Sequence, residues 1–123
     1  MDQNTRNVAI LSDFLRDAGY RTNSVSTLAE FDEFASDQTA LDDVSLAMVD
    51  LQGFDARIWE RCRKLHDAAV AFIVIARPRT AEAQHQVRRQ SHGAGARHTL
   101  TKPLRKEQLL TLVRILTETD EER

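Results

Sequence analysis

Apolar and polar positions alternate along the chain with two periods, one typical of helices and one typical of buried strands. Between residues 8 and 18, apolar side chains recur every three or four positions, and Gly19 follows them as a helix-ending residue. Residues 44–50 and 70–76 instead form short apolar runs. A continuous run of this kind indicates a strand that is buried on both faces of a sheet.

Read from end to end, the pattern predicts an alternation of helices and strands. The expected helices cover residues 8–18, 28–35, 56–65, 80–91 and 104–116, and the expected strands cover 21–27, 44–50, 70–76 and 96–101. The second helix opens with a capping box, Thr27-Leu-Ala-Glu30. This order predicts an α/β fold with a parallel sheet, right-handed crossovers and helices on both faces.

Two charged residues stand at the ends of predicted strands. Asp50 ends one apolar run, and Lys102-Pro103 closes the last strand. A carboxylate at the end of a buried strand is costly to desolvate unless a cation lies beside it, and Lys102 would meet that need. Parallel strands place these ends at one edge, where α/β folds bind ligands. The alternative is an ordinary acidic strand terminus.

Composition limits the class of protein. The 123 residues, 41% of them apolar, suit one globular domain and argue against disorder. The single cysteine, Cys62, excludes an internal disulfide, and we expect it to act as a small hydrophobic residue. No apolar run approaches the ~18 residues of a membrane helix. We therefore expect a cytoplasmic protein without membrane contact.

Charge is unevenly distributed, although the net charge is only −2. Residues 28–55 carry acids and no lysine or arginine, whereas residues 77–98 carry five arginines, three histidines and a single acid, Glu82. The basic stretch lacks the interleaved aromatic residues of a nucleic-acid surface, so no nucleic-acid partner is expected. It is interpreted as a solvated helix face or a protein-docking face, and the histidines as solvated side chains rather than metal ligands.

Five short motifs, in this order and spacing, resemble those of a known family. They are Asp2-Gln3-Asn4, Gly19-Tyr20, Val49-Asp50, His92-Gly93-Ala94 and Lys102-Pro103. Over 1–116 the chain resembles the receiver domain of two-component response regulators (CheY-like), with 117–123 as a charged tail. The resemblance implies a flavodoxin-like, doubly wound parallel sheet with strand order 2-1-3-4-5.

The resemblance also implies a chemistry for the strand ends. Asp50 would accept a phosphoryl group from a histidine kinase or phosphotransfer protein, and Asp2, Asp50 and the backbone carbonyl of Gln52 would hold Mg²⁺. Lys102 would bind a phosphoryl oxygen, and a cis peptide at Pro103 would orient it.

Three positions depart from the family pattern. Gln3 stands where a second acid is usual, which should weaken Mg²⁺ binding. Ala76 replaces the switch hydroxyl, and Thr99 replaces the aromatic residue that moves with it. The phosphoacceptor and the lysine are therefore retained, while the expected switch residues are degenerate.

The leading hypothesis is a receiver without an output domain that is not an enzyme and signals through protein contacts. Its docking or homodimer face would combine the helix after Thr80, the last strand and the helix from Leu104. The alternatives are a pseudo-receiver that works without phosphorylation, or a small flavodoxin-like enzyme or nucleotide binder. The last has little support, because a glycine-rich phosphate loop is missing from the sequence.

The preferred registration leaves only Met1 to represent the first strand of the sheet. In the competing registration, residues 7–11 form that strand and Ser12-Asp13 the acidic site, which leaves too short a first helix. Loss of a central strand exposes ladder groups on both of its neighbours. We therefore expect a marginal, strand-swapped or partner-completed chain, or one that continues upstream.

Overall fold

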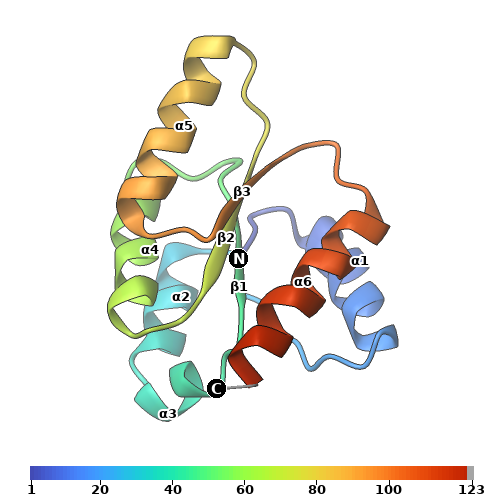
Figure 1. Ribbon diagram of the computed structural model, residues 1–123. Coiled ribbons are helices and arrows are strands. Elements are labelled where there is room, and N and C mark those ends of the chain that lie inside the picture. The colour runs from blue at the N-terminus through green and yellow to red at the C-terminus, as the bar shows by residue number, and fades with distance from the viewer. Residues whose placement is uncertain (122–123) are drawn as a thin grey trace.

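The computed structural model describes residues 1–121, and the side chains of all of these except residues 5, 7 and 118–121. These residues form six helices and three strands; three helices come first, and strands and helices alternate from β1 onward (Figure 1). The helices are α1 Thr5–Asp17, α2 Leu28–Ala35, α3 Gln38–Asp42, α4 Ile58–Asp67, α5 Ala81–Ala94 and α6 Lys106–Glu121. The strands are β1 Ala47–Asp50, β2 Phe72–Ala76 and β3 His98–Thr101. None of the described helices is both long and apolar enough to cross a bilayer.

The strands form one parallel sheet in the order β1-β2-β3. All five residues of β2 are buried, as its continuous apolar run predicted. In the register of the sheet, Asp50 pairs with Ile75, and Ala76 pairs with Thr101. The three strands therefore end at the same edge, which is the geometry on which a site built from strand ends depends.

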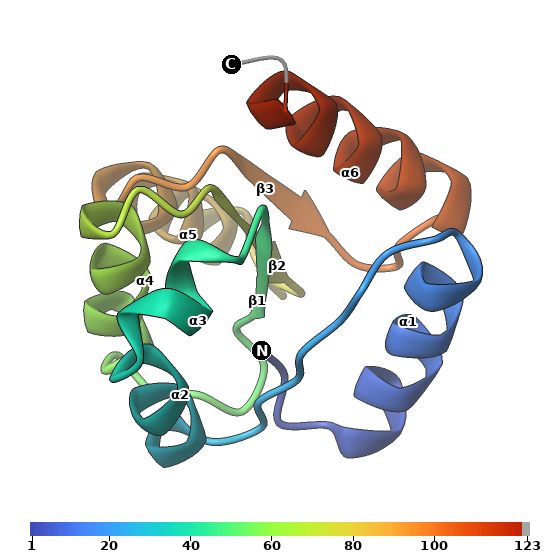
Figure 2. The same cartoon turned by 90° about the horizontal axis from the view of Figure 1, so that it is seen from below.

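Side chains of β2 alternate between two cores, one on each face of the sheet. Phe72 and Val74 pack into a core made with residues of α2 to α5, whereas Ile73 packs with Leu15, Leu109 and other residues of α1 and α6. Figure 2 shows the two helical layers on opposite sides of the strands. The prediction of an α/β fold with a parallel sheet covered on both faces is confirmed.

Several helix ends differ from the predicted ones. The capping box of α2 is present, because Glu30 N–H donates to Thr27 Oγ1 at 3.0 Å. The short helix α3 was not predicted; Asp37 caps it by accepting from Thr39 N and Ala40 N. Helix α5 continues through Gly93 to Ala94, and Gly95, whose φ of 96° is left-handed, caps its end. Helix α6 runs past the predicted tail boundary, and Thr117 is buried within it.

The predicted strand over residues 21–27 was wrong, because the described chain has no strand before β1. Met1 and Asp2 lie between this segment and β1 instead. Met1 N donates to Met48 O at 2.6 Å, Asp50 N donates to Met1 O at 2.9 Å, and Asp2 N donates to Val25 O at 3.1 Å. Met1 and Asp2 thus make, beside β1, a few of the backbone contacts that a complete first strand would make along its whole length.

Helix α1 decides between the two registrations. It begins at Thr5, and the Asn4 side chain caps it by accepting from Arg6 N at 3.1 Å. Residues 7–11 are therefore helical, so the competing registration was wrong. In a strand, backbone N–H groups two residues apart point to the same side. Met48 N–H therefore points to the same side of β1 as Asp50 N–H, where a longer first strand would lie.

This geometry predicts the effect of an added strand. Extending the chain before Met1 with Arg-Val-Thr-Val should raise the free energy of unfolding by about 1–3 kcal/mol, because each new backbone hydrogen bond contributes about 0.5–1.5 kcal/mol. It would also remove the ammonium group of Met1, whose pKa burial lowers, from the sheet. Urea unfolding would measure the difference against a Gly-Pro-Gly-Pro extension, which cannot complete a ladder. Equal stability of the two extended chains would contradict this prediction.

Candidate functional site

An ion pair joins the ends of β1 and β3 across the end of β2. Asp50 is the last residue of β1, and Lys102 follows the last residue of β3. Lys102 Nζ lies 2.6 Å from Asp50 Oδ2, with side-chain exposures of 15% and 5%. The predicted convergence of Asp50 and Lys102 at one edge of the sheet is confirmed. The carboxylate is nearly removed from water, and the ammonium group offsets the cost of burying its charge.

Gln52 holds both members of this pair. Its backbone N–H donates to Asp50 Oδ1 at 3.0 Å, and its side-chain Oε1 accepts from Lys102 Nζ at 3.1 Å. Gln52 was predicted to act only through its backbone carbonyl, so the contact of its side chain with the lysine was not predicted. A long polar side chain two residues after the strand-end acid was the available signal.

Asp2 is the second carboxylate of the site. It accepts from Asn4 N at 2.8 Å, which ties the acid to the start of α1. Burial of the carboxyl raises the pKa of Asp2, and the charge of Asp50 raises it further, although Asn4 N–H and Lys102 oppose the shift. The two acids therefore repel each other at the edge where the lysine lies. A bound cation would relieve this repulsion.

The Gln3 side chain lies beside the loop that follows β1. It is exposed, and its Oε1 contacts Gly53 at the place where a Cβ would stand. Gly53 has a φ of 86°, so this position favours glycine for its backbone, and a Cβ there would displace the Gln3 amide. Gly53 was not among the predicted site residues. A role of Gln3 at a metal stays a prediction.

The donor set suits a weakly held Mg²⁺ ion. Asp2 and Asp50 supply two carboxylates that repel each other, and Mg²⁺ commonly binds through one or two carboxylates together with water. Among the described residues, no group of three His, Cys, Asp or Glu side chains is arranged to hold a metal. These residues could thus hold the ion only with water and backbone oxygens completing its shell.

The two degenerate positions lie in neighbouring strands. Ala76 is buried at the end of β2, and its carbonyl accepts from Lys102 N at 2.9 Å. Thr99 is half-buried in β3, where it pairs with Val74. Ala76 lacks the hydroxyl and Thr99 lacks the aromatic ring that the resemblance implies at these positions. The Lys102-Pro103 peptide is cis, as that resemblance implied.

Other candidate side chains lie away from this site. Cys62 lies on the buried face of α4. Burial raises the pKa of its thiol to about 12, in agreement with a structural role. All four histidines are exposed, as predicted.

Known proteins resemble the chain in structure and not detectably in sequence. No protein-family model and no curated protein matches it. A response regulator receiver protein from Burkholderia phymatum matches with a TM-score of 0.75 at 23% identity, over 96% of this chain and 91% of the other. The receiver domain of a histidine kinase from Syntrophus aciditrophicus matches with a TM-score of 0.76 at 22% identity, over 97% and 87%. The chain has the CheY-like receiver fold.

A chemotaxis protein from Vibrio cholerae matches as well, with a TM-score of 0.70 at 16% identity over 94% of this chain and 92% of that one. The receiver fold thus extends over nearly all of the chain, as the sequence motifs implied. The sheet of this fold has the strand order 2-1-3-4-5. The strands β1, β2 and β3 of this chain form the part of that order written 3-4-5.

Replacing Asp2 with Asn should stabilise the metal-free protein at neutral pH by a few tenths of a kcal/mol, since the carboxylate is only partly buried. Because folding raises the pKa of Asp2, the folded protein binds the carboxyl proton more tightly than the unfolded chain. The ionised Asp2 carboxylate therefore destabilises the fold at neutral pH, and this destabilisation is lost as the pH falls through the pKa of Asp2. Urea unfolding in chelator at several pH values would measure it, with the exposed Asp13→Asn as the matched control. A gain that grows on acidification would contradict the proposed cause.

Removal of the lysine should leave Asp50 buried without its cation. We expect Lys102→Met to lower the free energy of unfolding by up to about 3 kcal/mol at neutral pH, because a buried charge loses its partner. Adding Asp50→Asn to this variant should recover part of the loss. A double-mutant cycle from urea unfolding measures the coupling. Strictly additive effects would show that the pair contributes nothing.

Proposed function

We propose that the chain is a phosphoacceptor receiver that takes a phosphoryl group on Asp50 from a histidine kinase or phosphotransfer protein. The observation that supports this most directly is the buried Asp50–Lys102 pair at the carboxyl edge of the sheet, with Asp2 beside it. Signalling would then pass by protein contact, in the cytoplasm, without a catalytic output of its own.

The chemistry requires a nucleophile and a means of neutralising charge. A carboxylate oxygen of Asp50 attacks phosphorus, the P–N bond of the phosphohistidine breaks, and the imidazole nitrogen keeps the electron pair and takes up a proton. Lys102 must then release Asp50 Oδ2 and donate to a phosphoryl oxygen. Gln52 Oε1, which accepts from Lys102 Nζ, would keep the lysine ammonium group at the site. Bound Mg²⁺ would supply further charge neutralisation.

The acidic set is one carboxylate short of the family pattern, so weak Mg²⁺ binding follows from the proposal. Gln3→Asp should tighten binding, provided that the new carboxylate turns from Gly53 toward Asp2.

Transmission of the signal would use the α5–β3–α6 face. This face contains an edge strand, β3, and the exposed Ile115 of α6. A partner protein could dock there. Because Ala76 and Thr99 lack the usual groups, phosphorylation would act on this face through the movement of Lys102 and the segment after β3.

A second candidate is a pseudo-receiver that binds partners without phosphorylation. The observation that favours it is that Lys102 already neutralises Asp50 at 2.6 Å, in a site with an altered switch. Here the ion pair would be structural, and Asp50→Asn would leave partner binding unchanged.

Incubation with acetyl phosphate and Mg²⁺ separates the two candidates. We expect the wild type to gain one hydroxylamine-sensitive phosphoryl group, detected by intact-mass spectrometry, and Asp50→Asn to gain none. Asp55→Asn is the matched control, because Asp55 is an exposed carboxylate that pairs with Arg57 outside the site. No modification of the wild type at millimolar Mg²⁺, or equal modification of Asp50→Asn, would favour the pseudo-receiver.

A further inference from the structure

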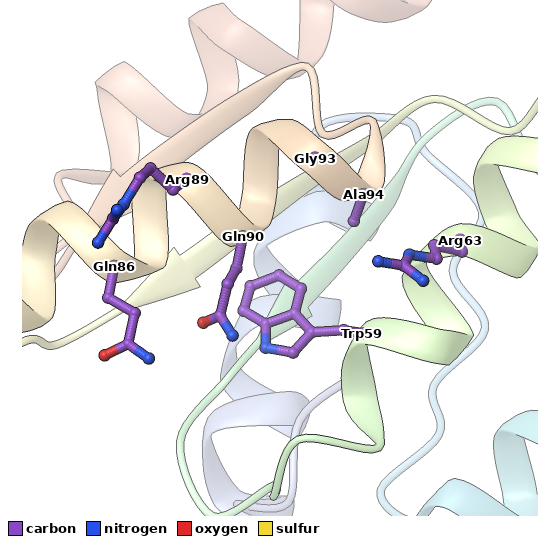
Figure 3. Close-up of a pocket in the computed structure, with 7 residues that line it drawn as sticks. All are labelled: Trp59, Arg63, Gln86, Arg89, Gln90, Gly93 and Ala94. Carbon is purple, nitrogen blue, oxygen red and sulfur yellow. The ribbon is translucent and has the colours of Figure 1, made fainter.

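A groove lies between α4 and α5, away from the carboxyl edge of the sheet. Its volume is about 330 Å³, and Trp59, Arg63, Gln86, Arg89 and Gln90 are among its lining residues. Figure 3 shows the Trp59 indole reaching from α4 toward α5, with Arg63 and Gln90 on either side of it. Arg89 extends along α5 toward Gln86. We call these five residues the basic groove.

The cations of the basic groove lack acidic partners within the described residues. Two other arginines near the groove do have acidic partners. Arg61 of α4 pairs with Asp32 of α2 at 2.8 Å, and Arg57, just before α4, pairs with Asp55 at 2.8 Å. Arg63 and Arg89 appear in no ion pair of the described chain, and no acid lines the groove. The Arg63 guanidinium beside the half-buried indole, with the unpaired Arg89 farther along α5 near Gln86, favours an anionic partner with an apolar centre.

The chain itself carries a surface of that chemistry. Glu30, Glu33 and Asp37 surround a hollow of about 370 Å³ whose lining includes Phe34. All three acids are exposed and appear in no ion pair of the described chain, although Glu30 and Asp37 also accept capping hydrogen bonds at the starts of α2 and α3. We call these three acids the acidic rim. It runs along α2 to the start of α3.

The two surfaces lie on different sides of α4. Helix α4 contacts α2 on one side and α5 on the other, so it separates the acidic rim from the basic groove. Figure 2 shows α2 and α5 at different ends of this helical layer. One copy therefore cannot pair its own rim with its own groove, and both surfaces stay available to other copies.

We propose that the basic groove binds the acidic rim of a second copy of this chain, in a head-to-tail contact. Arg63 and Arg89 reach the rim carboxylates on long side chains, and Trp59 faces the apolar floor at Phe34. Such a contact is heterologous, because each copy uses a different surface on each side, so it produces open chains or rings rather than closed pairs. Exposed charges are screened by salt, so the contact is weak and dependent on ionic strength.

Sedimentation velocity at low salt, without a phosphodonor, tests the contact independently of the proposed phosphorylation. We expect the wild type to associate as its concentration rises, and 0.5 M salt to disperse it. Arg89→Glu should weaken association by about tenfold or more, because it places like charges together. Arg88→Glu is the matched control, with the same change of charge outside the groove. Trp59, the only tryptophan, should show a concentration-dependent change in emission.

A mixing experiment tests the head-to-tail arrangement. Glu33→Arg damages the rim and leaves the groove, whereas Arg89→Ala damages the groove and leaves the rim, and the two altered surfaces carry no new pair of opposite charges. Each variant alone should stay monomeric, and an equimolar mixture should form 1:1 dimers that grow no further. A monomeric wild type, equal effects of Arg88→Glu and Arg89→Glu, or a mixture that stays monomeric would overturn the proposal. Capture of an acidic peptide by a monomeric wild type would also overturn it in favour of another partner.

Discussion

The contact between Asp50 and Lys102 constrains much of the rest of this structure. A carboxylate that ends a buried strand needs a compensating cation, and here that cation comes from a strand two places away in the sheet. The two groups meet only because β1, β2 and β3 are parallel and end at one edge. The register of the sheet, the loop that carries Gln52 and the segment after β3 must all be in place for the ion pair to form.

The most predictable parts of the fold were those in which local sequence and tertiary burial agree. The continuous apolar sequence of β2 predicts that the strand is buried on both faces of the sheet, as it is. The Thr27–Glu30 capping box predicts where α2 begins. Asp50 and Lys102 were identifiable because a charge at the end of an apolar run requires a partner. The site thus followed from the cost of burying charge, together with the rule that parallel strands end at one edge.

The parts that could not be predicted depend on contacts distant in sequence. Residues 21–27 have strand-like composition, but a strand exists only if a neighbour pairs with it, and within the described chain Asp2 alone does so, through Val25. Helix α5 passes through Gly93 because the left-handed cap lies at Gly95, and the sequence offers both glycines equally. The place of Gln52, two residues after the strand-end acid, indicates a polar role, but nothing local identifies its partner as a lysine fifty residues later.

The buried thiol of Cys62 gives the protein an internal probe of its own opening. The sulfur lies under α4 with no exposed surface, and its raised pKa keeps it protonated at neutral pH. A thiol reagent can therefore reach it only when α4 separates from the sheet, so the labelling rate measures how often that layer opens. Since α4 also carries Trp59 and Arg63, a single chemical modification can report whether contacts made at the surface tighten the core beneath it.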